Sequence, residues 1–111
     1  MTRSAQERIA DVLDAVENCE RYRRRFTDPD AEVVEMAFQA ALRYLAVIGE
    51  AVNHLPSEIT DAHPGIPWAS IVEMRNILVH EYFAIDTSIV TTALDRDLAP
   101  LAAALRTHRG D

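Results

Sequence analysis

Apolar residues recur at three- and four-residue intervals over four long stretches of the chain, a pattern typical of amphipathic helices. We predict helices over residues 4–26, 29–54, 67–83 and 87–107, with a short helical turn at 57–62. Strand-like alternation of apolar and polar residues is absent. The pattern therefore predicts an all-α protein, an antiparallel bundle of four main helices with one short extra helical turn. In three of these helices we expect the residues of the apolar face to point toward the core. They are Ile9, Val12, Leu13, Val16, Cys19, Tyr22 and Phe26; Val34, Phe38, Ala41, Leu42, Leu45, Ile48, Val52 and Leu55; and Ile89, Val90, Ala93, Leu94, Leu98, Leu101 and Leu105.

Capping and breaking residues indicate where these helices begin and where they are interrupted. Ser4 and Glu7 have the S-x-x-E spacing of a capping box. Asp28 followed by Pro29 is typical of an N-cap and first helical position. Pro100 falls inside the last predicted helix, and we expect it to kink or briefly interrupt that helix.

The predicted helix over 67–83 carries the side chains with the most specific chemistry. Arg75, Asn76, His80 and Tyr82 lie within eight positions and alternate with apolar residues. At about 100° per residue, Asn76 and His80 share one helix face, and Arg75 and Tyr82 share another. Histidine exchanges a proton near neutral pH, and arginine presents a planar cation that fits phosphate oxygens. Such a pair can cleave RNA without a metal, although both residue types also occur as solvated or hydrogen-bonded structural groups.

Gly49 and Glu50 form a second notable pair, inside the predicted helix over 29–54. Glycine inside a helix costs about 1 kcal/mol relative to alanine, and here it would let another helix approach closely. Glu50 beside it has two interpretations. It either orients His80 or an arginine, or it is a surface or interface glutamate.

Four arginines, Arg21, Arg23, Arg24 and Arg25, gather near the end of the first predicted helix. Cations are favourable at a helix C-terminus, whereas an RNA-binding role would use the same charges to contact phosphates. Because these arginines point in different directions around the helix, the first interpretation is favoured.

Composition narrows the class of protein. A chain of 111 residues, 49% hydrophobic and 26% charged, is ordinary for one soluble globular domain, which we place at 1–111. The formal net charge of −7 argues against broad nucleic-acid binding but leaves room for a small basic cleft. We expect a cytoplasmic protein, because Cys19 has no disulfide partner and neither a signal peptide nor a membrane span is visible. The sequence contains no motif for a metal or cofactor site, and we predict neither.

The string from Arg75 to Tyr82 has the form R-x4-H-x-Y, with Asn76 directly after the arginine, and resembles the signature of HepT-like proteins in the HEPN superfamily. The resemblance runs roughly from Ile9 to Leu105. It includes further matches in the same order: Gly49-Glu50-Ala51, Ile66-Pro67-Trp68, Tyr82-Phe83 followed by Asp86, and Pro100-Leu101.

This resemblance implies a prokaryotic ribonuclease toxin that acts on RNA and is encoded beside a minimal nucleotidyltransferase antitoxin. Arg75 and His80 match the catalytic pair, Asn76 the polar residue that follows the arginine, and Tyr82 the tyrosine to which the antitoxin adds AMP. The family works as a homodimer whose two motifs meet in one cleft, and further assembly with the antitoxin is left open. The alternative is a non-catalytic HEPN module that binds a nucleotidyltransferase or nucleotide, in which Arg75 and His80 hold phosphate without cleaving.

Overall fold

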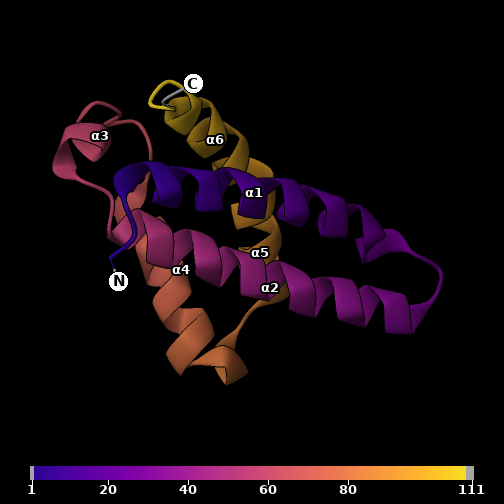
Figure 1. Ribbon diagram of the computed structural model, residues 1–111. Coiled ribbons are helices and arrows are strands. Elements are labelled where there is room, and N and C mark those ends of the chain that lie inside the picture. The colour runs from indigo at the N-terminus through magenta and orange to yellow at the C-terminus, as the bar shows by residue number, and fades with distance from the viewer. Residues whose placement is uncertain (1, 110–111) are drawn as a thin grey trace.

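The computed structural model describes residues 2–109, and within them every regular element is helical (Figure 1). The predicted domain span of 1–111 also includes Met1, Gly110 and Asp111, which lie outside the described residues. None of the described helices has the combination of length and hydropathy needed to cross a membrane.

Two long helices, α1 (Ala5–Arg23) and α2 (Ala31–Asn53), run antiparallel and are joined through the 3-10 turn η1 (Arg24–Thr27). After the short helix α3 (Ser57–Asp61), helix α4 (Trp68–His80) crosses the α1–α2 hairpin steeply, and a final helical rod returns in the opposite direction (Figure 1). The prediction of an all-α fold with four main helices and one short extra helix is confirmed.

The final rod contains three consecutive pieces: α5 (Thr87–Thr92), the π-helical turn η3 (Ala93–Asp97) and α6 (Leu98–Arg106). An α-helical turn before Pro100 would direct the Arg96 carbonyl at the proline ring. The wider π turn contains Arg96 and directly precedes the helix that carries Pro100, so the predicted brief interruption is present without a break in the rod.

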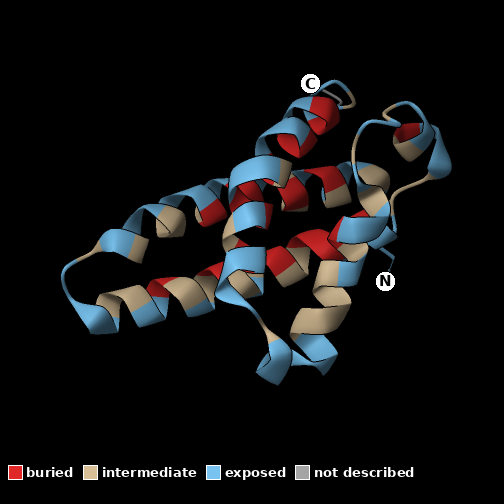
Figure 2. Cartoon of the chain, turned by 180° about the vertical axis from the view of Figure 1, so that it is seen from behind, coloured by how far each residue is buried: buried red, intermediate tan, exposed pale blue. Residues whose placement is uncertain are grey.

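The core lies where the hairpin and the final rod face each other, and Figure 2 shows the buried positions concentrated there. Most residues predicted to face inward are buried or half-buried. Ile89 is an exception, because half of its surface is exposed. It lies at the start of the rod, next to a cleft that separates α5 from α4.

Helix starts follow side-chain caps. The capping box at α1 is confirmed, because Ser4 Oγ accepts a hydrogen bond from the Glu7 N–H and Glu7 Oε1 accepts one from the Ser4 N–H. The prediction that Asp28 caps the second helix is wrong. Pro29 disfavours helical geometry in the residue before it, and Asp28 is extended. Its carboxylate instead accepts a hydrogen bond from the Asp30 N–H, and Asp30 is the N-cap of α2.

The helix that carries Arg75 and His80 ends earlier than predicted. α4 stops at His80, and Tyr82 lies in a separate 3-10 turn, η2 (Tyr82–Ala84). Residues 81–84 are all exposed, so no packing favours continuing the helix there. The predicted helix face shared by Arg75 and Tyr82 therefore does not exist, because the two residues are on different elements.

Candidate active site between helices α2 and α4

Helices α2 and α4 approach each other closely at Gly49. A Cβ atom at this position would overlap the Cβ of Arg75 and would lie 3.1 Å from both the Cγ of Arg75 and the carbonyl oxygen of Ile71. The expectation that this glycine admits a neighbouring helix is confirmed. The contact packs the base of the Arg75 side chain and the Ile71 carbonyl directly against α2.

Arg75 is held by two neighbours at this crossing. Its Nη2 lies 3.1 Å from Glu50 Oε2, and its Nη1 donates a 3.1 Å hydrogen bond to Asn76 Oδ1. Glu50 was expected either to orient His80 or an arginine or to be a surface or interface glutamate. Its contact with Arg75 agrees with the first of these interpretations. The other Glu50 oxygen lies 3.1 Å from His54 Nε2, so a chain of polar contacts runs from α2 into the motif.

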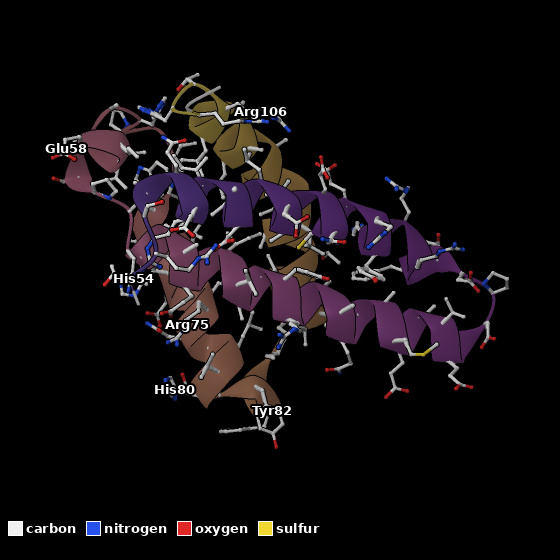
Figure 3. All side chains as sticks on the ribbon, viewed as in Figure 1. His54, Glu58, Arg75, His80, Tyr82 and Arg106 are labelled. Atoms are coloured by element: carbon white, nitrogen blue, oxygen red, sulfur yellow. The ribbon has the colours of Figure 1, made fainter. Side chains whose placement is uncertain are left out.

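The imidazole of His80 lies outside this network. His80 is the last residue of α4 and is exposed. His80 follows Arg75 by five positions, which turns the two side chains about 140° apart on a helix. Figure 3 shows both side chains projecting from α4, with His80 toward the free end of the helix. Within one chain, the structure therefore brings Arg75, Asn76 and Glu50 together and leaves His80 apart.

Tyr82 is also highly accessible. Its exposed fraction is 72%, and its ring contacts the edge of Phe83 at a centroid distance of 6.1 Å. Figure 3 shows Tyr82 in the turn below α4. Although it is not on the motif helix, Tyr82 lines the same cleft as Arg75.

That cleft, which we call the arginine cleft, has a volume of about 700 Å³ and lies between α1, α2 and the α4–η2 segment. Its charged lining residues are four arginines and two acids, which gives a formal charge of +2 in a chain of net charge −7. They are Arg3, Arg8, Arg43 and Arg75, with Asp11 and Glu50. The small basic cleft that the acidic composition left room for is therefore present.

Sequence reasoning missed Arg3, Arg8 and Arg43 as site residues. They come from the N-terminal segment, α1 and α2, and only the fold brings them next to Arg75. The spacing of Arg43 from Glu50 could have indicated that the two side chains lie near each other. Arg43 precedes Glu50 by seven residues, so both side chains lie on one face of α2.

A second cleft, which we call the apolar cleft, lies on the other side of α4. Its volume is about 640 Å³, its charged lining residues are Glu73 and Asp97, and burial raises the pKa of Asp97. Most of its lining is apolar and comes from α2, α4 and the final rod, including Leu45, Ile48, Met74, Ile77 and Ile89. Helix α4 thus separates a basic cleft from an apolar, acidic one.

Three of the four arginines near the end of α1 make contacts inside the fold. Arg23 makes two hydrogen bonds to the Asp95 carboxylate, at 3.0 and 3.1 Å, which tie α1 to η3. Arg25 pairs with Asp28 at 3.7 Å, and Arg21 stacks over the ring of Tyr22. These contacts favour the structural interpretation of the cluster. Within residues 2–109, no three His, Cys, Asp or Glu side chains gather as a metal site would require.

Comparison with known proteins adds independent information. The family model described as "Ribonuclease HepT-like" matches residues 12–107. A protein of Thermococcus cleftensis described as "probable ribonuclease HepT" is 31% identical over 101 residues, which cover 91% of this chain and 92% of that protein. A Methanocaldococcus jannaschii protein described as "gamma-glutamylcyclotransferase and putative RNase" is 31% identical over 90 residues, which are 81% of this chain and 40% of that protein. No solved structure is significantly similar to the chain.

Proposed function

Because the chain belongs to the HepT-like family of ribonucleases, we propose that it is a metal-independent endoribonuclease and the toxin of a prokaryotic toxin–antitoxin pair. The observation that carries the proposal is the placement of Arg75. Its guanidinium is oriented by Glu50 and Asn76 and lines a basic cleft on an otherwise acidic protein.

The reaction is an internal transesterification of RNA. The ribose 2′-oxygen attacks the phosphorus, a base takes its proton, and the bond from phosphorus to the 5′-oxygen breaks as that oxygen receives a proton. The products are a 2′,3′-cyclic phosphate and a 5′-hydroxyl. His80 moves a proton in this scheme, Arg75 stabilises the charge that builds on the phosphoryl oxygens, and Asn76 holds the arginine fork in position.

A homodimer accounts for the separation of Arg75 and His80 within one chain. Two motif helices that meet across a two-fold axis place the Arg75 of one protomer near the His80 of the other. Large apolar side chains exposed around the end of α4 support such a contact. Val79 is 47% exposed, Phe83 79% and Ile89 50%.

Tyr82 is the proposed acceptor of AMP from a minimal nucleotidyltransferase antitoxin. Its hydroxyl attacks the α-phosphorus of ATP, and pyrophosphate leaves. The 72% exposure of Tyr82 gives an enzyme access, and its position in the arginine cleft puts the new phosphodiester near Arg75. The modification thereby blocks the phosphate site by charge and bulk.

The test is cleavage of single-stranded RNA by the purified protein and its His80→Ala and Arg75→Ala variants, with Arg106→Ala as the control. Arg106 is exposed near the end of α6. We expect each site variant to lose about 100-fold or more in rate, with unchanged helix content by circular dichroism and cyclic-phosphate ends on the wild-type products. Equal cleavage by His80→Ala and the wild type would refute the mechanism, and an inactive wild type that binds nucleotidyltransferase would favour the non-catalytic module.

A further inference from the structure

We propose that Arg43 and Arg8 bind phosphates on one side of the scissile one, so that the RNA backbone follows the arginine cleft from Arg75 along α2 toward α1. This inference rests on the proposed ribonuclease function. It assigns a substrate-binding role to two residues that lie outside the sequence motif.

The first support is the balance of charges inside the cleft. Of its two carboxylates, Asp11 is engaged by Arg3 through two 2.8 Å hydrogen bonds, and Glu50 is engaged by Arg75 and His54. Neither carboxylate neutralises Arg43. Among the described residues, the guanidinium of Arg43 has no carboxylate partner, and its side chain is exposed at the cleft wall.

Arg8 has an acidic neighbour, Glu7, but among the described residues it forms no ion pair that would keep it from binding a phosphate. It is half-buried on the α1 side of the cleft. The pKa of Glu7 is lowered mainly by its hydrogen bonds to Ser4, then by the charge of Arg3, and least by the charge of Arg8. A cation in a concave, partly desolvated wall attracts an anion more strongly than the same cation on a flat surface. Arg8 and Arg43 therefore add a phosphate-binding surface beside Arg75.

The second support is spacing. Arg43 precedes Glu50 by seven residues of α2, which is about 10 Å along the helix axis, and Glu50 contacts Arg75. A nucleic-acid strand advances about 3.4 Å per phosphate along a duplex and further when it is extended. The rise along α2 from Glu50, which contacts Arg75, to Arg43 thus corresponds to about three phosphates, within the reach of one short RNA segment.

This arrangement limits the electrostatic footprint of RNA to a few phosphates. If Arg75, Arg43 and Arg8 each neutralise one phosphate of a single strand, the logarithm of the association constant should fall with the logarithm of salt with a slope of about −2. An acidic protein with such a cleft binds a short single strand locally and gains little from a longer one.

The experiment measures binding of a labelled single-stranded RNA whose riboses are all 2′-O-methylated, which removes the attacking hydroxyl and prevents cleavage. Fluorescence anisotropy at several salt concentrations compares the wild type with Arg43→Gln, Arg8→Gln and the control Arg106→Gln. In Figure 3, Arg106 lies above α1 and Arg75 lies below α2, so that the hairpin is between them in this view. Glutamine keeps a long polar side chain and a high helix propensity.

We expect Arg43→Gln and Arg8→Gln each to weaken binding about tenfold at low salt and to reduce the magnitude of the slope by about 0.7, while Arg106→Gln matches the wild type. If both cleft variants bind like Arg106→Gln although the wild type binds and cleaves RNA, the inference is wrong and the proposed function stands. If the wild type neither binds nor cleaves RNA, both the inference and the proposed function are wrong. Circular dichroism of each variant separates lost contacts from lost folding.

Discussion

Replacing Gly49 by alanine tests how closely the motif helix is seated on α2. On helix propensity alone the change should stabilise the protein by about 1 kcal/mol, because alanine is the better helix former. The packing around Gly49 predicts instead that the change destabilises the protein. The added Cβ would overlap the Cβ of Arg75 and approach the Ile71 carbonyl oxygen to 3.1 Å.

The size of the effect follows from what the new methyl group meets. Apolar atoms prefer separations of about 3.5–4.0 Å. Neither a Cβ nor a backbone carbonyl can rotate away, so α4 has to shift as a unit. Overpacking of this kind costs about 1–3 kcal/mol, and the Cβ overlap places Gly49→Ala at the upper end. After subtracting the propensity gain, we expect a net loss of about 2 kcal/mol in the free energy of unfolding.

Urea unfolding at a fixed protein concentration measures this loss, and the fluorescence of Trp68 reports on the start of α4. The indole N–H of Trp68 bonds the carbonyls of Thr60 and His63, both at 3.0 Å. Gly65→Ala is the matched control, because a Cβ there meets nothing within 4 Å and should leave stability unchanged or raise it by up to about 1 kcal/mol. If Gly49→Ala proves as stable as Gly65→Ala, the reasoning about the α2–α4 contact is refuted.

Gly49→Ala also has a predicted effect on activity that is separate from stability. The shift of α4 moves Arg75 relative to Glu50, and displacements of about 1 Å near a reacting group can reduce a rate about 100-fold. RNA cleavage should therefore fall under conditions in which the variant is still fully folded.

Four further predictions concern stability and accessibility. Burial raises the pKa of Asp97, so the charged carboxylate opposes folding above that pKa. Asp97→Asn should therefore increase the free energy of unfolding at pH 7. It should not do so at pH 3, where the carboxyl is protonated in both the folded and the unfolded protein. The charge of Asp95 favours folding instead, because its hydrogen bond to Arg23 lowers its pKa. Asp95→Asn should therefore destabilise the protein at pH 7. Urea unfolding at a series of pH values should show this loss of stability disappearing as the pH falls through that lowered pKa. Burial raises the pKa of the Cys19 thiol to about 12, so a thiol reagent at pH 8 should label it only at the rate of unfolding, and immediate labelling would contradict the burial. Ser4→Ala removes half of the α1 capping box and should cost about 1 kcal/mol in thermal or urea unfolding.

The long helices could be predicted from the sequence because their periodic apolar faces are the ones that the fold buries. Ile9, Val12 and Val16 of α1 are buried against α2 and the final rod. The end of the motif helix could not be predicted in this way. Tyr82 and Phe83 continue an apolar pattern but lie on the surface. The hydrophobicity of a segment does not show whether the fold provides another surface for that segment to pack against.

The candidate site divides along similar lines. Glu50 and Arg75 were singled out from local patterns, and their contact depends on Gly49, which the sequence also marks as unusual. Arg8 and Arg43 were missed because their relation to Arg75 is created only when three helices meet. For Asp28, the rule for N-caps competed with the restriction that Pro29 places on the residue before it, and the restriction decided the geometry.

Helix α4 packs on α2 along one side and has a cleft on each flank, and only Ile71 of its residues is buried. In Figure 2 it is mostly tan and pale blue. A helix with so little buried surface opens at a lower free energy than α1 or α2, and its amides should exchange with solvent sooner. RNA bound in the arginine cleft, as proposed above, would restrain that motion. Amide exchange along α4 should therefore slow when RNA binds, although RNA would touch only one side of the helix.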